Sequence, residues 1–160
     1  MVFLLLLAGA ALFVWETCRT LPPVVATHFG ASGAANGFMP RSFYLRFMLA
    51  FVVLLPLSLT AGLGRILRMP NARINLPERD YWLAAERRAE TVEVLVQYLR
   101  VFSVVLVAFL CYVHWQVVRA NQLAPPALDN ARFSAGLGAF LLALVVWIVA
   151  LRRRFRVPAR

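Results

Sequence analysis

The sequence has few charges and no lysine at all. Only 15% of its 160 residues are charged and 62% are hydrophobic, whereas about a quarter of the residues in a soluble domain are charged. Seven acidic residues face 17 basic ones, all of them arginine, which leaves a net charge of +10. These shortages exclude a soluble monomeric domain. They indicate an integral membrane protein whose arginines set its orientation and do not bind nucleic acid.

Groups that could carry chemistry are also scarce. The chain has two cysteines and two histidines, and its acidic residues form no pair inside an apolar segment. It contains no Ser/His/Asp set, no glycine-rich phosphate loop and no nucleotide motif. We therefore expect neither a cofactor nor an enzymatic activity.

Four apolar segments dominate the chain. They cover approximately residues 1–21, 42–67, 92–118 and 133–151, and each is close to the roughly 20 residues that a spanning helix needs. We predict an all-α protein with a single membrane domain of four transmembrane helices. No basic residue precedes the first segment and no small-x-small site follows it, so we interpret it as a span and not as a signal peptide. The missing basic start also leaves open an initiation site upstream of Met1.

Two features bear on how the helices pack. Pro56 interrupts the second segment and predicts a kink, with Ser58 and Thr60 available to bond the freed backbone groups. In the last segment small residues recur at four-residue spacing, Ser134 with Gly138 and Ala135 with Ala139. Such spacing lets helices approach closely, which favours a packed four-helix bundle.

The arginines in the connections predict the orientation. One group comprises Arg65, Arg68, Arg73, Arg79, Arg87 and Arg88 between the second and third segments and Arg152, Arg153, Arg154, Arg156 and Arg160 in the tail. The other two connections hold Arg19, Arg41, Arg119 and Arg132. Because cytoplasmic loops are enriched in basic residues, both termini and the inner loop, 68–91, should be cytoplasmic, and the outer loop, 22–41, should face outward. We expect a multi-pass protein of the bacterial inner membrane that meets anionic lipid at its inner face.

The outer loop combines turn residues with a histidine. Pro22 ends the first helix, and Gly33 and the pair Asn36–Gly37 are turn signals around His28. With Cys18, Cys111 and His114 on the same side of the membrane, His28 offers a possible ligand set for zinc or copper. The spacing of these four residues matches no known metal motif, so we favour structural roles for them. A disulfide between Cys18 and Cys111 is a further possibility.

Two arginines lie within apolar segments, where a charge must snorkel or pair. Arg46 is near the outer boundary, and snorkelling accounts for it better than anion binding does. Arg100 is deeper and shares a helical stripe with Glu93 and Gln97. We expect a polar seam that faces the bundle. A structural ion pair is the favoured interpretation of the seam, and an ion path in a small transporter subunit is the alternative.

The inner loop is the richest polar segment. Pro77 stops a helix, but residues 80–91 contain good helix formers, with Glu86 and Glu90 alternating against Arg87 and Arg88. We predict a short interfacial helix that leads into the third span. Without further information it is a solvated charged face that sets topology.

The two loops carry sequence patterns beyond this physical interpretation. The outer pattern consists of Leu21, Pro22, His28, Phe29, Gly33 and Gly37, and the inner one of Asn75, Pro77, Tyr81, Trp82, Leu83, Ala84, Glu86, Arg87, Arg88, Glu90 and Thr91. Together they resemble a bacterial membrane family, the domain of unknown function 1648, whose better-known relatives are the SdpI-type immunity proteins. The sequence departs from the family pattern at Pro23 and Asn36, where Asp is common, and at Ala26 and Ala85, where Pro is common.

The resemblance implies membership of this family, but it does not imply a mechanism. The missing acids weaken the idea of a cation site in the outer loop, and SdpI-type proteins have further helices, so immunity activity is not carried over. We expect a non-enzymatic protein that binds or senses a ligand, such as a peptide or protein, at the outer loop and transmits the event through the inner loop. The rival hypotheses are a metal-binding membrane enzyme that uses His28, His114 and Cys111 and a transporter subunit that uses Arg100.

Overall fold

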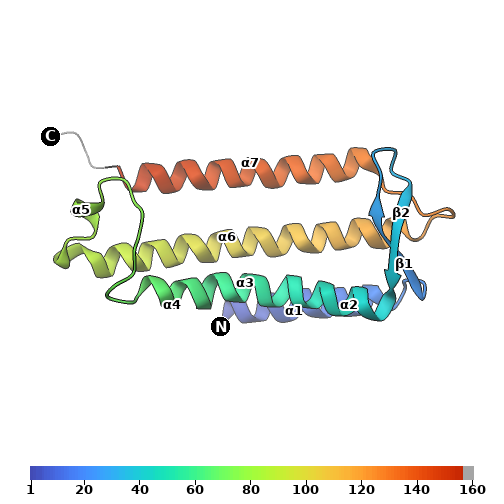
Figure 1. Ribbon diagram of the computed structural model, residues 1–160, viewed down its shortest axis with the longest axis horizontal. Coiled ribbons are helices and arrows are strands. Elements are labelled where there is room, and N and C mark those ends of the chain that lie inside the picture. The colour runs from blue at the N-terminus through green and yellow to red at the C-terminus, as the bar shows by residue number, and fades with distance from the viewer. Residues whose placement is uncertain (157–160) are drawn as a thin grey trace.

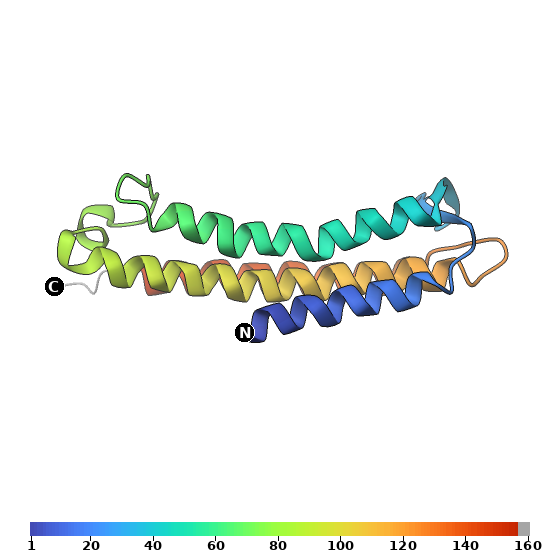
Figure 2. The same cartoon turned by 90° about the horizontal axis from the view of Figure 1, so that it is seen from below.

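The computed structural model describes residues 1–156, so Arg160 of the basic tail lies outside the described residues. The helices run along one common axis (Figure 1). Helix α6 (Ala85–Ala120) is the central element, in contact with α1 (Val2–Cys18), with α7 (Asn130–Arg154) and with the rod formed by α2 to α4. Figure 1 shows α7 on one side of α6, and α1 and the rod on the other, while the view in Figure 2 shows the rod and α1 flanking α6.

The rod is one continuous helix with two widened stretches around Pro56. Its parts are α2 (Arg41–Leu49), η1 (Ala50–Leu54), α3 (Leu55–Leu57), η2 (Ser58–Leu63) and α4 (Gly64–Leu67), where η1 and η2 are π-helical. The Thr60 hydroxyl donates to the Pro56 carbonyl at 2.9 Å, and the Ser58 hydroxyl donates to the Leu55 carbonyl at 2.8 Å. Proline lacks an amide proton, so the helix widens and bends here, as Figure 2 shows. The predicted distortion at Pro56 is confirmed.

Three helices are long and apolar enough to cross a membrane: Arg41–Leu67, Ala85–Ala120 and Asn130–Arg154. Helix α1 is also apolar but has 17 residues, ending at Cys18 instead of reaching Leu21. At about 1.5 Å per residue it covers about 25 Å, less than the roughly 30 Å of a hydrocarbon core. The chain is thus a helical multi-pass membrane protein.

Each long helix contains a charge-free segment with an arginine at either end. The segments are 47–64, 101–118 and 133–151, and the bounding residues are Arg46 and Arg65, Arg100 and Arg119, and Arg132 and Arg152. Segments of this length rise about 27 Å, close to the thickness of a hydrocarbon core. Arg46 and Arg100 therefore bound the apolar segments and do not interrupt them. Residues 85–99 of α6 then extend beyond the apolar layer, and Figure 1 shows α6 reaching past α4 and α7 at this end.

The outer loop is a β-hairpin, so the prediction of an all-α protein is wrong there. Strand β1 (Val24–Phe29) pairs antiparallel with β2 (Ala35–Pro40), with a register shift between Ala26 and His28. Gly33 lies in the turn with a φ of 83°, a left-handed conformation that glycine adopts without strain. The backbone N–H and C=O groups of the two strands hydrogen-bond to each other. In an irregular loop the same groups would need water as their partner.

The inner loop also differs from its prediction. The interfacial helix expected over residues 80–91 is only one turn, α5 (Arg79–Trp82), and α6 begins at Ala85 instead of Val92. Ala84 has an extended ψ of 148°, which breaks the chain direction between the two helices. Glu86 to Thr91 therefore belong to the first two turns of the central helix.

Two apolar cores stabilise the molecule. The larger one joins α1, α2, η1 and α6 near the hairpin, through buried residues such as Val14, Tyr44, Val52 and Val118. The smaller one, around Ile74, Val92 and Val96, holds the inner loop against the base of α6. The fold thus has a packed region at each end of the central helix.

Candidate functional site

A buried histidine joins three helices beneath the hairpin. The side chain of His114, on α6, is fully buried, with 0% of its surface exposed. Its Nε2 atom lies 2.7 Å from Oγ1 of Thr17 on α1, and its Nδ1 atom lies 2.9 Å from the hydroxyl of Tyr44 on α2. His114 is therefore the polar connection between α1, α2 and the central helix.

The hydrogen-bond directions fix the tautomer of His114. The Thr17 hydroxyl donates its proton to the Phe13 carbonyl at 2.6 Å, so it accepts a proton from Nε2. Nδ1 is then the unprotonated nitrogen and accepts from Tyr44. The Tyr44 ring stacks on the imidazole and the Phe13 ring meets it edge-on, both at a centroid distance of 5.7 Å. A neutral imidazole with both nitrogens bonded is poorly suited to bind a metal.

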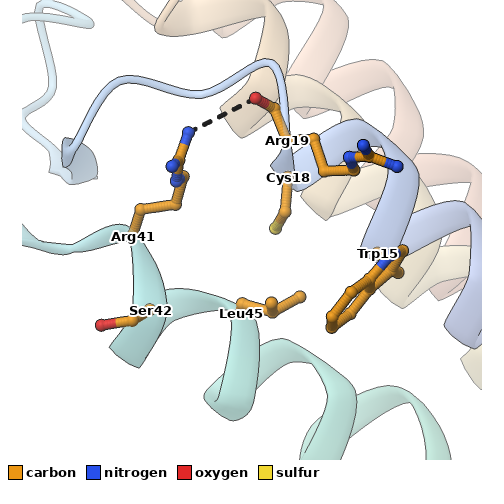
Figure 3. Close-up of a pocket in the computed structure, with 6 residues that line it drawn as sticks. All are labelled: Trp15, Cys18, Arg19, Arg41, Ser42 and Leu45. Carbon is orange, nitrogen blue, oxygen red and sulfur yellow. Dashed lines mark hydrogen bonds between the residues drawn. The ribbon is translucent and has the colours of Figure 1, made fainter.

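A cleft of about 350 Å³ opens between α1 and α2 next to this histidine. Six residues line it: Trp15, Cys18, Arg19, Arg41, Ser42 and Leu45 (Figure 3). Arg41 donates to the carbonyls of Leu21 at 2.8 Å and Arg19 at 3.3 Å, which holds its guanidinium at the mouth. Cys18 is 2% exposed, and Figure 3 shows its thiol pointing between the two helices. The cleft combines an apolar wall with the guanidinium of Arg41 and with that of Arg19, which also forms an ion pair with Glu16 at 3.3 Å.

The hairpin is tied to the connection that follows α6. Asn121 donates to the Ala26 carbonyl at 2.9 Å and accepts from the Ala26 amide at 2.8 Å. Asn130 donates to the Ala31 carbonyl at 2.7 Å, and the Leu128 amide bonds to the Gly33 carbonyl at 2.8 Å. Sequence patterns did not single out Thr17, Tyr44, Arg41 or Asn121 as residues of this site. The only sequence signal for these four residues is that they are polar and lie near the ends of apolar segments.

The four proposed metal ligands are not assembled. His28 is exposed on β1, with Gly37 opposite it, and Cys18 and Cys111 are free thiols, so the suggested disulfide is absent. Within residues 1–156 no three His, Cys, Asp or Glu side chains lie close enough to hold a metal. The remaining residues of the outer motif are spread along the hairpin: Leu21, which is buried, and Pro22, which is half-buried, precede β1, Phe29 is half-buried at the end of β1, and Asn36 is exposed on β2.

The inner motif forms a second cluster, which we call the inner clamp: Trp82, Arg87, Arg88, Thr91 and Phe155. The Trp82 indole donates to the Phe155 carbonyl at 2.9 Å, and the two rings meet edge-on at 5.3 Å. The Thr91 hydroxyl donates to the Trp82 carbonyl at 2.9 Å. Phe155 is 1% exposed. The clamp fastens the end of α7 to the inner loop and the base of α6.

The two arginines of the clamp bond to carbonyl oxygens. Arg87 donates to the Tyr81 carbonyl at 2.8 Å, and its guanidinium carbon lies 4.0 Å from the centre of the Tyr81 ring. Arg88 donates to the Met69 carbonyl at 2.8 Å. In the described part of the chain neither arginine pairs with a carboxylate. Glu90 instead meets Arg154 at 3.6 Å, and Glu86, Asn75 and Pro77 are exposed.

The expected polar seam lies at the surface. Glu93 forms a two-point ion pair with Arg68, at 2.8 and 3.1 Å, and both side chains are about half exposed. This hydrogen bond raises the pKa of the Arg68 guanidinium. Gln97 and Arg100 are exposed, as is Arg46 on α2. The partner of Glu93 is therefore Arg68 and not Arg100.

Comparison with known proteins gives one match. No curated protein and no solved structure was found to be similar to the chain. The family match covers α1, the hairpin, α2 and η1, and therefore every residue that lines the cleft. Residues 2–54 match the family described as "Domain of unknown function (DUF1648)", which is the family that the loop motifs resemble.

Proposed function

We propose that the protein is a non-enzymatic receptor of the bacterial inner membrane that binds an anionic ligand in the outer cleft. The cleft is the observation that carries this proposal, because it places Arg19 and Arg41 beside the apolar surfaces of Trp15 and Leu45. The Arg41 guanidinium, which bonds only to carbonyl oxygens among the described residues, favours a carboxylate or phosphate, and the apolar wall favours a ligand with a hydrophobic body. A peptide or protein segment with an acidic group fits both. A role like that of SdpI-type immunity proteins would be one form of such binding.

The proposed topology has four spans and cytoplasmic termini. Eleven arginines, six from Arg65 to Arg88 and five in the tail, against four in the other connections, support this orientation. Helix α1 serves as the fourth, short span because residues 1–15 carry no charged side chain. The cleft and the hairpin then face outward, where a ligand arrives without crossing the membrane.

The central helix connects the cleft with the inner clamp. His114 holds α1 and α2 together directly below the cleft, and Arg87, Arg88 and Thr91 lie in the first two turns of the same 36-residue helix. A ligand that moved α1 relative to α2 would have to change the bonds of His114. We propose that such a change moves α6 and thereby alters the contacts of the inner clamp.

Photocrosslinking from Ser42 tests the proposal. Ser42 is exposed and lines the cleft, so a photoreactive amino acid there should capture the ligand in growing cells. The matched control is the same amino acid at Ser134, which is exposed near the corresponding end of α7. We expect a non-lipid adduct at residue 42 that Arg19→Gln reduces and that residue 134 does not form. Lipid adducts alone, equal at both positions, would rule out the receptor.

A further inference from the structure

A groove lies at the other end of the bundle, beside the first residues of α1. Helix α1 has 17 residues and α6 has 36, and Figure 2 shows α1 beginning well inside the length of α6. Around the start of α1, the space between α1, α6 and the rod forms a cavity of about 800 Å³, open on one side. Val2, Leu57, Thr60, Val96, Arg100 and Val104 are among the residues that line it.

The groove has apolar walls and one available cation. Leu57, Val96 and Val104 supply aliphatic surface, and the Thr60 hydroxyl is already bonded to the Pro56 carbonyl. Arg68, at the rim, is paired with Glu93. Arg100 has neither a hydrogen bond nor an ion pair with any residue in the part of the chain that the structure describes. It also marks the end of the charge-free segment 101–118, at the level where lipid phosphates lie.

We propose that this groove holds one anionic phospholipid, with its phosphate on Arg100 and an acyl chain along Val104 and Leu57. The occupant must be apolar over most of its length and negative where it meets Arg100, as a phospholipid of the inner leaflet is. A second copy of this chain fits less well. Its apolar segments 1–15, 47–64, 101–118 and 133–151 contain no carboxylate that could reach Arg100. This site is separate from the outer cleft and does not depend on the receptor proposal.

Lipid binding to the purified, delipidated protein in detergent tests the site. Phosphatidylglycerol is the anionic probe and phosphatidylcholine the neutral one, and native mass spectrometry counts the molecules retained. We expect one phosphatidylglycerol to bind in preference to phosphatidylcholine. Arg100→Gln should weaken phosphatidylglycerol binding about fivefold and leave phosphatidylcholine binding unchanged. The matched control is Arg153→Gln, which removes one exposed charge from the tail and should keep the preference.

A second variant tests the apolar part of the groove without changing the charge of Arg100. Ala61 is exposed and lines the groove, so Ala61→Phe fills space for the acyl chain and keeps Arg100. We expect it to abolish the tightly retained lipid while the melting temperature in lipid-free detergent stays within a few degrees. Equal effects of Arg100→Gln and Arg153→Gln would overturn the proposal, because they would show a general surface attraction. A dimer that Ala61→Phe dissociates would overturn it too, since the occupant would be a second copy.

Discussion

The indole nitrogen of Trp82 donates a hydrogen bond to the carbonyl oxygen of Phe155, 73 residues further along the chain. Trp82 belongs to the inner motif, and Phe155 follows the last residue of α7. Because Phe155 is buried and Arg154 lies 5.3 Å from the centre of the Trp82 indole, the end of α7 cannot leave the inner loop without exposing both rings. Through this bond the inner motif stabilises the fold, in addition to supplying positive charge.

Replacement of Trp82 should loosen the end of α7. Trp82→Phe keeps an aromatic ring but removes the indole donor, so it should cost about 1 kcal/mol of unfolding free energy. Trp82→Ala should cost more, because the ring packing on Phe155 is lost as well. The readout is the detergent melting temperature together with the rate at which protease removes the chain after Arg152. Trp115→Phe, at an exposed indole on α6, is the control and should change neither quantity.

The contact between α6 and α7 should depend on one glycine of α7. A Cβ atom at Gly136 would overlap the ring of Tyr112, whose hydroxyl donates to the Arg132 carbonyl, whereas a Cβ at Gly138 would meet nothing within 4 Å. We expect Gly136→Ala to cost about 1–3 kcal/mol, because the ring or the helix must move. Gly138→Ala should be neutral or slightly stabilising, since alanine is the better helix former. Melting temperatures of the two variants in the same detergent provide the comparison, and equal values would contradict the close approach of the two helices.

The apolar segments predicted most of the helical layout, because residues 47–64, 101–118 and 133–151 lack charge for the length of a membrane crossing. The ends of the helices were less predictable. Helix α6 begins at Ala85, seven residues before the apolar pattern. The hairpin was missed because its strands are short and its turn signals also fit an irregular loop.

The candidate site was harder to predict for a different reason. Its central contact joins residues 17, 44 and 114, which lie on three different helices. Periodicity along one helix does not show how helices are rotated about their axes, so it cannot show which polar groups meet. His114 was singled out for its chemistry, but its partners Thr17 and Tyr44 are ordinary residues at the ends of apolar segments.

Removal of the hydrogen bonds to His114 should weaken the bundle in a coupled way. Tyr44→Phe leaves the buried Nδ1 atom without a donor and should cost about 1–3 kcal/mol of unfolding free energy. His114→Leu removes the imidazole but leaves the hydroxyl of Tyr44 buried and unpaired, with a cost of similar size. The double variant should then be less destabilised than the sum of the two. A double-mutant cycle from denaturation in detergent measures this coupling, and simple additivity would contradict the bond.

The proposed orientation can be tested by cysteine accessibility. In a background with Cys18→Ala and Cys111→Ala, single cysteines replace Ser32 in the hairpin turn and Asn71 in the inner loop, both exposed. In the proposed orientation, which rests on eleven arginines against four, Asn71 is cytoplasmic, so a membrane-impermeant maleimide added to intact cells should label Ser32→Cys alone. Permeabilised cells serve as the control, where both positions should react. Labelling of Asn71→Cys in intact cells would invert the topology.

Lysine substitutions at Arg87 and Arg88 distinguish a role in topology from a role in specific bonding. If they only set topology, lysine should replace both without effect, because it carries the same charge. The structure gives Arg87 a stacked position on Tyr81 and a bond to the carbonyl of the same residue, and gives Arg88 a bond to the Met69 carbonyl. Lysine cannot stack and donate in one plane as a guanidinium does, so Arg87→Lys should lose about 0.5–1 kcal/mol of stability.

Arg88→Lys should cost less than Arg87→Lys, because a flexible ammonium can still reach one carbonyl oxygen. We therefore expect the double lysine variant to insert in the normal orientation but to melt at a lower temperature in detergent. Tyr81→Leu should lower the melting temperature in the same way and make Arg87→Lys nearly neutral, since the ring that the guanidinium covers is gone. If the double lysine variant keeps both its melting temperature and the labelling pattern at residues 32 and 71, these two arginines contribute only their charge.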